Sequence, residues 1–344
     1  MKRPVTVVTG FLGSGKTTLL GRVLSKPSMK NTAVLVNEFG EVGLDHHLLR
    51  RTNERTVLLG SGCVCCTTRE DLVEAMLDLL ALENSGETSQ LERVVIETTG
   101  LADPAPILFT IFSDPVLQHH FTVDLVITTA DAVNGALHLD RNPESVKQVA
   151  AADKIIITKT DIAEAGAAQA LIARLRAINP YARITEVAFG EVDPEDLFRP
   201  DPSGAATGSL GDRAGTDQRF LEGPDAHDIA ETHSVSLTFD GPVDWTAFGI
   251  WLSMLLHTHG EDVLRVKGLL DVGEAGPVVL NGVQHIIHPP QHLGSWPDPD
   301  HRSRIILITK RIRPGEILDS LRAFRCMIGA KPRLLEDEHV TTLS

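Results

Sequence analysis

Aromatic residues are scarce in this sequence, and no run of basic residues offsets its acidic charge. Phe, Trp and Tyr make up 4% of the 344 residues, and the formal net charge is −14. Proteins that bind single-stranded nucleic acid stack its bases on aromatic side chains in a basic groove. A strongly acidic surface repels a polyanion. The composition therefore argues against nucleic acid as a partner.

Long apolar runs are also missing. No segment approaches the roughly 20 apolar residues that cross a bilayer. The opening Met1-Lys2-Arg3-Pro4 leaves no room for the apolar core of a secretory signal before a glycine-rich segment begins at Gly10. We therefore expect a cytoplasmic protein that has no membrane partner.

Cysteine is rare, with four in the chain, yet three of them lie within four residues: Cys63, Cys65 and Cys66. In a reducing compartment such a cluster favours metal or redox chemistry over a disulfide framework. Three thiolates this close can supply most of a tetrahedral site for Zn²⁺ or another soft divalent ion. We expect metal ligation, with redox chemistry and simple packing as the alternatives.

The first half of the chain alternates short β-branched runs with helical stretches. The expected strands are Val5–Val8, Ala33–Val36, Val94–Ile96, Leu125–Thr128 and Ile155–Thr158, and the helical stretches include Lys16–Ser25, Arg69–Glu83 and Ala163–Ile178. This alternation predicts an α/β domain with a mostly parallel sheet, covered on both faces by helices. Ligands of such sheets bind beyond the carboxyl ends of the strands.

A phosphate-binding loop follows the first expected strand. Residues 10–17 read Gly-Phe-Leu-Gly-Ser-Gly-Lys-Thr and match G-x-x-x-x-G-K-[ST], with a strand before and a helix after. Backbone N–H groups and the helix N-terminus would hold the phosphates, Lys16 would bridge the β- and γ-phosphates, and the Thr17 hydroxyl would hold Mg²⁺. The residues expected to contact the nucleotide here are Gly10, Gly13, Ser14, Gly15, Lys16, Thr17 and Thr18.

Two further strand ends carry polar residues. Glu97 ends an apolar run, where a buried carboxylate is costly unless it meets a cation. We expect it to reach the Mg²⁺ shell or to orient the attacking water, which makes Lys16, Thr17 and Glu97 the candidate catalytic residues. A strand that merely finishes in polar residues is the alternative. The Gly100 N–H is placed to sense the γ-phosphate.

The third strand end predicts the nucleotide base. Thr158, Lys159 and Asp161 follow the expected strand Ile155–Thr158. The Asp161 carboxylate can accept both N1–H and N2–H of guanine, and adenine offers no matching pair of donors. GTP with Mg²⁺ is therefore the expected ligand, although Asp161 could also be a simple helix N-cap.

A break in the pattern divides the chain. From residue 198 to residue 232 the sequence is rich in Pro, Gly and Ser and lacks apolar periodicity, which is typical of a flexible linker. We expect a GTPase domain over 1–197, a smaller α+β domain over 233–330 and a tail over 331–344. The strands expected in the smaller domain are Val235–Phe239, Leu264–Asp271, Val278–Ile287 and Arg304–Ile312. The expected helices are Asp244–His257 and Gly315–Ile328, and Pro314 marks the start of the second.

Several segments taken together carry a family resemblance. They are the phosphate loop, Asn37–Glu41, Gly62–Cys66, Glu97–Pro104, the Lys159/Asp161 loop and Leu264–Gly268. The chain thereby resembles the CobW family of P-loop GTPases, which are akin to the UreG and HypB metallochaperones, over nearly its whole length. The resemblance implies a GTPase that loads Zn²⁺ or Co²⁺ onto a client metalloprotein. It also implies that Cys63, Cys65 and Cys66 bind the transferred metal, and that Glu38 could join that site.

The chain departs from the family pattern at one position of the base loop. The family's usual Asn is Thr158 here, so we expect the amide that contacts the base and braces the phosphate loop to be lost. Other interpretations stay open: a cobalt-handling protein of cobalamin synthesis, an activator of a nitrile-hydratase type of enzyme, a small-molecule kinase, or a nucleotide-dependent interaction module. A nucleotide-dependent homodimer is also left open.

Overall fold

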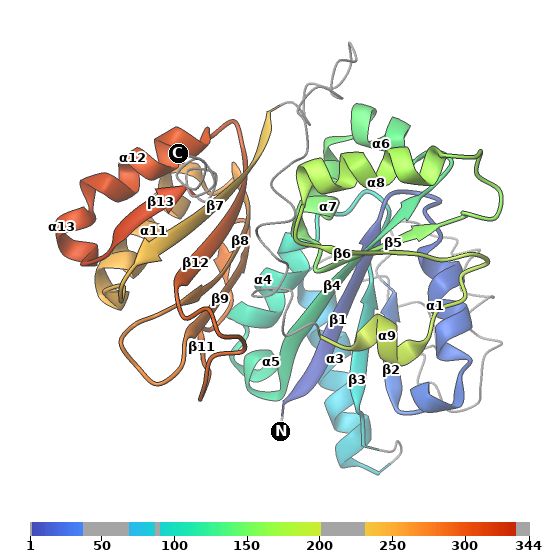
Figure 1. Ribbon diagram of the computed structural model, residues 1–344. Helices are drawn as coiled ribbons and strands as arrows, with labels where there is room; N and C mark the ends of the chain where they lie inside the picture. The colour runs from blue at the N-terminus through green and yellow to red at the C-terminus, as the bar shows by residue number, and fades with distance from the viewer. Residues whose placement is uncertain (1, 37–68, 87–89, 201–230, 335–344) are drawn as a thin grey trace. The chain divides into compact units, whose positions relative to one another are not determined.

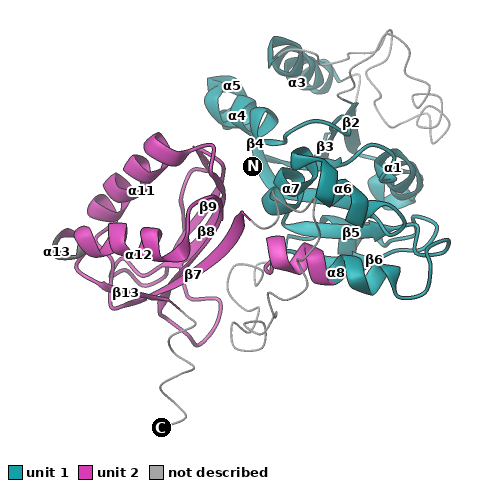
Figure 2. Ribbon diagram, turned by 90° about the horizontal axis from the view of Figure 1, so that it is seen from above, with its two compact units in different colours: residues 1–172, 182–200 teal, residues 173–181, 201–344 magenta. Residues whose placement is uncertain are grey.

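The computed structural model describes residues 2–36, 69–86, 90–200 and 231–334, and it divides into two compact units. The first unit comprises residues 1–172 and 182–200, and the second comprises residues 173–181 and 201–344 (Figure 2). Most of the expected linker, residues 201–230, lies outside the described residues.

The first unit is built on a six-stranded sheet in which every neighbouring pair is parallel. In spatial order the strands are β2 (Thr32–Val36), β3 (Arg93–Glu97), β1 (Arg3–Gly10), β4 (Phe121–Asp131), β5 (Lys154–Thr158) and β6 (Arg183–Glu186) (Figure 1). All five expected strands are present, which confirms the α/β class. The strand order reverses beside β1, and such a switch point is where parallel sheets bind ligands.

Helices connect these strands. They are α1 (Lys16–Leu24), the 3₁₀ turn η1 (Pro27–Met29), α3 (Arg69–Asn84), α4 (Ala105–Ser113), α5 (Pro115–His120), α6 (Gly135–Arg141), α7 (Pro143–Ala151), α8 (Ala167–Ile178) and α9 (Pro194–Phe198). Helix α1 and helix α9 pack on one face of the sheet through Leu20, Phe198 and strand residues such as Val8 and Ile127. By alternation, Val7 and Val126 point to the opposite face, and α7 contacts β1 and β4. Burial on both faces explains why these strands are continuously apolar.

The register of the parallel strands aligns their carboxyl ends. Glu97 at the end of β3 pairs with Val8 of β1 and with Val36, the last residue of β2. On the other side Gly10 pairs with Thr129, and Asp131 at the end of β4 pairs with Thr158. The polar strand ends singled out in the sequence therefore meet along one edge of the sheet.

The second unit is an antiparallel sheet that helices cover on one face (Figure 1). Its elements in chain order are β7 (Thr232–Asp240), α11 (Trp245–His259), β8 (Val263–Leu270), β9 (Val278–Val283), β10 (Ile286–Ile287), β11 (Gln291–His292), β12 (Ser303–Lys310), α12 (Pro314–Ala323), α13 (Arg325–Ile328) and β13 (Lys331–Leu334). Phe239, Phe248, Trp251 and Leu307 lie in its core. The second, α+β part of the predicted fold class is confirmed.

Three elements of the second unit differ from the sequence predictions. The segment Val278–Ile287 is not one strand, because the chain turns back at Gln284 (φ 54°) and β10 pairs with the end of β9. The terminal helix is interrupted at Phe324, between α12 and α13. The expected tail begins with a strand, since β13 pairs with β7 along Lys331–Leu334.

Candidate functional site

The loop between β1 and α1 closes tightly against β4. Gly10 has a φ of 139°, and a Cβ built there would lie 2.3 Å from Thr129 Oγ1. No side chain fits in that space, so glycine is required where the loop leaves the strand. Gly13 and Gly15 also have positive φ angles, and α1 begins directly afterwards at Lys16. Residues 10–17 thus form a loop that ends on a helix N-terminus, the arrangement that binds phosphate groups.

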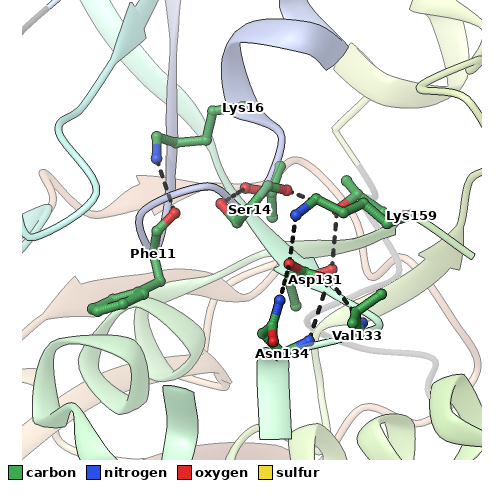
Figure 3. A network of polar contacts seen from close by, with 10 residues as sticks. Phe11, Ser14, Lys16, Asp131, Val133, Asn134 and Lys159 are labelled. Carbon is green, nitrogen blue, oxygen red and sulfur yellow. Dashed lines mark hydrogen bonds and ion pairs between the residues drawn. The ribbon is translucent and has the colours of Figure 1, made fainter. Parts of the chain in front are cut away.

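Lys16 and Thr17 project from the first turn of α1. The Lys16 side chain is buried and folds back over the loop, where Nζ donates to Gly10 O at 2.7 Å and to Phe11 O at 3.2 Å (Figure 3). Thr17 Oγ1 donates to Glu97 Oε1 at 2.5 Å. Thr18, the next residue, is exposed. The candidate catalytic residues Lys16, Thr17 and Glu97 therefore come together at the end of β1 and β3.

The segment after Glu97 lies against the phosphate-binding loop. A Cβ at Gly100 would stand 2.5 Å from the backbone nitrogen of Leu12. Thr98 fixes the start of the segment, because its N–H donates to Val8 O at 2.9 Å and its hydroxyl oxygen lies 2.9 Å from Thr9 Oγ1. Gly100 therefore lets the backbone of this segment approach the phosphate-binding loop closely. That its N–H senses a bound phosphate stays a prediction.

Thr158 lacks the family's amide, but it still braces the phosphate-binding loop. Its hydroxyl donates to Ser14 O at 2.7 Å, and Ser14 Oγ shares a 2.6 Å hydrogen bond with Thr129 Oγ1. All three side chains are buried. A threonine is short, but β5 approaches the loop closely enough for its hydroxyl to replace the bracing function of an amide.

Lys159 is held by a carboxylate that the sequence analysis did not single out. Its Nζ forms an ion pair of 2.6 Å with Asp131 Oδ2 at the end of β4 (Figure 3). Asp131 also accepts bonds from the backbone N–H groups of Val133 and Asn134 and from the side-chain amide of Asn134. Burial raises the pKa of this carboxyl, but the Lys159 ammonium and these hydrogen bonds outweigh it, so the pKa of Asp131 lies below the ordinary value.

Asp161 is exposed at the turn after β5, where its Oδ1 accepts a bond from Phe189 N at 3.2 Å. Lys159, two residues earlier, has a left-handed backbone with φ 58°. The base loop is thus anchored by Thr158 and Lys159 and ends in a carboxylate that faces solvent. His138 of α6 packs on the Phe11 ring, with centroids 4.5 Å apart, and burial lowers the pKa of His138.

Three buried polar residues of this region were missed: Thr129, Asp131 and Gln148. Thr129 and Asp131 escaped because the fourth strand was expected to end at Thr128, whereas β4 continues to Asp131. Treating Asp131 as another polar strand end would have identified it. Gln148 lies in the middle of α7 and carries no signal in the sequence.

The residues expected to bind the transferred metal ion lie outside the described residues. These are Cys63, Cys65, Cys66 and Glu38, whereas Thr17, expected to hold Mg²⁺, is described. Within the parts of the chain that the structure describes, no group of three or more His, Cys, Asp or Glu side chains could hold a metal ion. Nor is any helix of those parts long and apolar enough to cross a membrane.

Replacement of Asp131 by Asn should destabilise the protein by about 1 to 3 kcal/mol at pH 7, because the Lys159 ammonium loses its charged acceptor. A carboxyl with a lowered pKa in the folded state stabilises the protein above its unfolded pKa, and this contribution disappears as the pH falls through the folded pKa. The difference between wild type and variant should therefore shrink below the ordinary value of 3.8. Urea unfolding of both proteins between pH 7 and pH 3 measures this. A constant difference would contradict it.

Comparison with known families matches both units. Residues 4–186 match the CobW/HypB/UreG nucleotide-binding domain, and residues 232–325 match the cobalamin synthesis protein cobW C-terminal domain. The first match spans more than half of the 344 residues, and the second covers most of the second unit.

Individual relatives agree with this result. The chain is 34% identical to the zinc chaperone YjiA of Escherichia coli, over 93% of this chain and 98% of that protein. It is 31% identical to the zinc chaperone CobW of a Sinorhizobium species, over 79% and 82% of the two chains. A crystal structure of Zn(II)-bound YjiA GTPase from E. coli superposes with a TM-score of 0.68 at 32% identity, covering 94% of this chain and 99% of the other. The chain therefore belongs to the CobW/HypB/UreG family of P-loop nucleotide-binding proteins and carries the CobW type of C-terminal domain.

Proposed function

We propose that the chain is a GTP-hydrolysing metallochaperone that binds Zn²⁺ or Co²⁺ through Cys63, Cys65 and Cys66 and delivers the ion to a client metalloprotein. The relatives named as zinc chaperones support the metal, and the fission-yeast relative, a zinc-regulated GTPase metalloprotein activator at 27% identity, supports the GTPase activity. The geometry of the phosphate-binding loop supports nucleotide binding.

In this proposal the terminal phosphates bind within the loop of residues 10–17. The Lys16 ammonium moves from the carbonyls of Gly10 and Phe11 to the β- and γ-phosphate oxygens, which are charged and therefore stronger acceptors. Thr17 and Glu97 bring their side-chain oxygen atoms side by side. Mg²⁺ prefers oxygen ligands, so these two side chains would hold the ion directly or through water. Bound Mg²⁺ supplies neutralisation of the phosphate charge.

Guanine recognition falls to Asp161 in this proposal. Thr158 uses its hydroxyl to brace Ser14, and Lys159 uses its ammonium to bind Asp131. Of the three base-loop side chains, Asp161 is the exposed carboxylate, and it can accept two hydrogen bonds from the guanine edge. We expect GTP to be preferred over ATP because adenine would leave that carboxylate unpaired.

One observation carries the coupling between nucleotide and metal. The chain leaves the sheet at Val36, whose register partner is Glu97, and it returns to a described helix at Arg69. Residues 37–68, which contain Cys63, Cys65 and Cys66, therefore follow directly on the strand end adjacent to the carboxylate that bonds Thr17. A nucleotide that reorganises Thr17 and Glu97 acts where this segment begins, so GTP and metal can bias one conformational equilibrium.

GTP and metal should therefore strengthen each other's binding by one common factor, because coupling between two sites is reciprocal. We expect the Zn²⁺ affinity to rise about tenfold when a non-hydrolysable GTP analogue replaces GDP, and we expect Zn²⁺ to raise the ratio of the analogue affinity to the GDP affinity by the same factor. Fluorescence competition with a metal chelator and with a labelled nucleotide measures the two sides of this cycle. Co²⁺ is tested in the same way.

Cys65→Ser should weaken Zn²⁺ binding about a hundredfold and remove the coupling, since a hydroxyl is a poor ligand for this ion. Cys326→Ser is the matched control and should change neither quantity. Equal Zn²⁺ affinity with GDP and with the GTP analogue in the wild-type protein would refute metal delivery under nucleotide control. GTP hydrolysis alone would then remain.

Two further properties stay predictions. The sequence predicts a cytoplasmic location, and a nucleotide-dependent homodimer is a possibility that it leaves open. Sedimentation of the protein with GDP and with the GTP analogue tests the second.

A further inference from the structure

One buried amide on α7 holds the segment that follows β3. The Gln148 side chain is 1% exposed, and its Nε2 donates to Gly100 O at 3.2 Å and to Ala102 O at 2.9 Å. A primary amide carries two hydrogens, so both bonds can form at once. A single side chain thus fixes two carbonyls of the segment that lies against the phosphate-binding loop.

Gln148 is itself anchored to the centre of the sheet. The Thr128 hydroxyl on β4 donates to Gln148 O at 2.8 Å, and both residues are buried. Helix α7 also contacts β1, the strand that leads into the phosphate-binding loop. The Gln148 side chain therefore extends from a helix position that β4 and β1, two strands of the candidate site, hold in place.

These bonds determine where the N–H groups of the segment point. The Thr98 hydroxyl donates to Thr99 O at 3.0 Å, and Gln148 binds the next carbonyl, that of Gly100. Peptide groups are planar, and the described residues contain no cis peptide bond, so each N–H points opposite to the carbonyl of its own peptide group. The N–H groups of Gly100 and Leu101 consequently point away from the Thr98 hydroxyl and from Gln148.

We propose that Gln148 is a positioning residue for recognition of the γ-phosphate. By holding Gly100 O, it presets the N–H group of Leu101 to meet the terminal phosphate, and by holding Ala102 O it fixes the segment that also presents the N–H group of Gly100. In this way it sets the preference for the triphosphate over the diphosphate. This inference rests on the proposed GTP site. Hydrogen-bond donors that are already oriented need no rearrangement when the charged terminal phosphate binds.

A second contact from the same helix provides a matched comparison. Lys147 forms an ion pair of 3.3 Å with Asp103 at the far end of the segment, and the Lys147 side chain is 41% exposed. Exposed ion pairs contribute little. Lys147→Met therefore removes an anchor from the same helix with little expected effect on nucleotide preference.

Gln148→Leu keeps the size of the side chain but removes both donors. We expect its affinity for a non-hydrolysable GTP analogue to fall about tenfold, which corresponds to about 1.4 kcal/mol. The GDP affinity should stay within about twofold of wild type, because the diphosphate does not reach Gly100. The kcat for GTP hydrolysis should fall about tenfold or more. Competition against a labelled nucleotide, steady-state kinetics and thermal unfolding measure these quantities for the variant and for Lys147→Met.

Each outcome decides the inference. Equal losses of GDP and GTP-analogue affinity would mean that Gln148 only stabilises the fold. Affinities that both stay at the wild-type value would also overturn the inference. Either result would leave the proposed function intact. A wild-type chain that binds neither nucleotide would overturn the proposed function and this inference with it. If Gln148→Leu does not fold, amide exchange of the wild-type protein decides. The GTP analogue should slow exchange at Gly100 and Leu101 at least fivefold relative to GDP, and equal exchange rates would refute the proposal.

Discussion

Lys16→Ala should reduce kcat/KM for GTP hydrolysis by about a thousandfold or more, about 4 kcal/mol of transition-state stabilisation. The Lys16 ammonium is buried within the loop of residues 10–17, where it already lies 2.7 Å from Gly10 O. A phosphate bound in that loop would replace the carbonyl as acceptor and bring its developing charge to the ammonium. Removing the cation leaves that charge without its strongest donor. Steady-state phosphate release measures the effect.

Lys26→Ala is the matched control. Lys26 also donates its Nζ to a backbone carbonyl, that of Val192, at 2.8 Å, but this contact lies at the other end of α1 from the phosphate-binding loop. We expect its kcat/KM to stay within about twofold of wild type. Comparable losses in the two variants would show that lysine contacts to the backbone matter for folding, and would remove the assigned role of Lys16.

Gly100→Ala should lower kcat for GTP hydrolysis about a hundredfold. The new Cβ would lie 2.5 Å from Leu12 N and 2.6 Å from Leu12 Cα, so one of the two backbones must move. A displacement of about 1 Å in a catalytic site costs on the order of a hundredfold in rate. Overpacking should also reduce the free energy of unfolding by about 1 to 3 kcal/mol. Single-turnover hydrolysis and urea unfolding separate the two effects.

The same substitution at Gly21 serves as the control. Gly21 lies within α1, and a Cβ there meets no atom within 4 Å. Alanine is the better helix former, so Gly21→Ala should raise the free energy of unfolding by about 0.5 to 1 kcal/mol and leave kcat unchanged. If Gly100→Ala behaved like Gly21→Ala, the close contact with Leu12 would have no catalytic role.

Sequence patterns predicted the first unit better than the second. Its five expected strands are apolar on both faces, and the two-sided burial that produces this pattern also specifies a parallel sheet. In the second unit the run Val278–Ile287 is broken by a reversal at Gln284, a residue type that gives no turn signal. Strand β13 was missed since Lys331, Pro332 and Arg333 have no apolar alternation, and β7 supplies its pairing partners.

The site shows the same division. Sequence motifs identified the phosphate-binding loop together with Glu97, Gly100 and Asp161. The chemistry of these residues depends on neighbours in the chain or on the end of a strand. The bonds from Thr158 to Ser14 and from Lys159 to Asp131 join residues 144 and 28 positions apart. Such pairs form only when β4 pairs with β1 on one side and with β5 on the other, so no local pattern could reveal them.

The sequence by itself determined the α/β class, the phosphate-binding loop and the cysteine cluster, because periodicity and short motifs are local properties. The tertiary structure decided which polar groups meet at the carboxyl edge of the sheet. It set Val36 beside Glu97, replaced the expected amide brace by the Thr158 hydroxyl, and brought Gln148 against Gly100 and Ala102. The physical reason is that hydrogen bonds reach about 3 Å. Contacts that short depend on the register and packing of strands and helices that are remote in the chain.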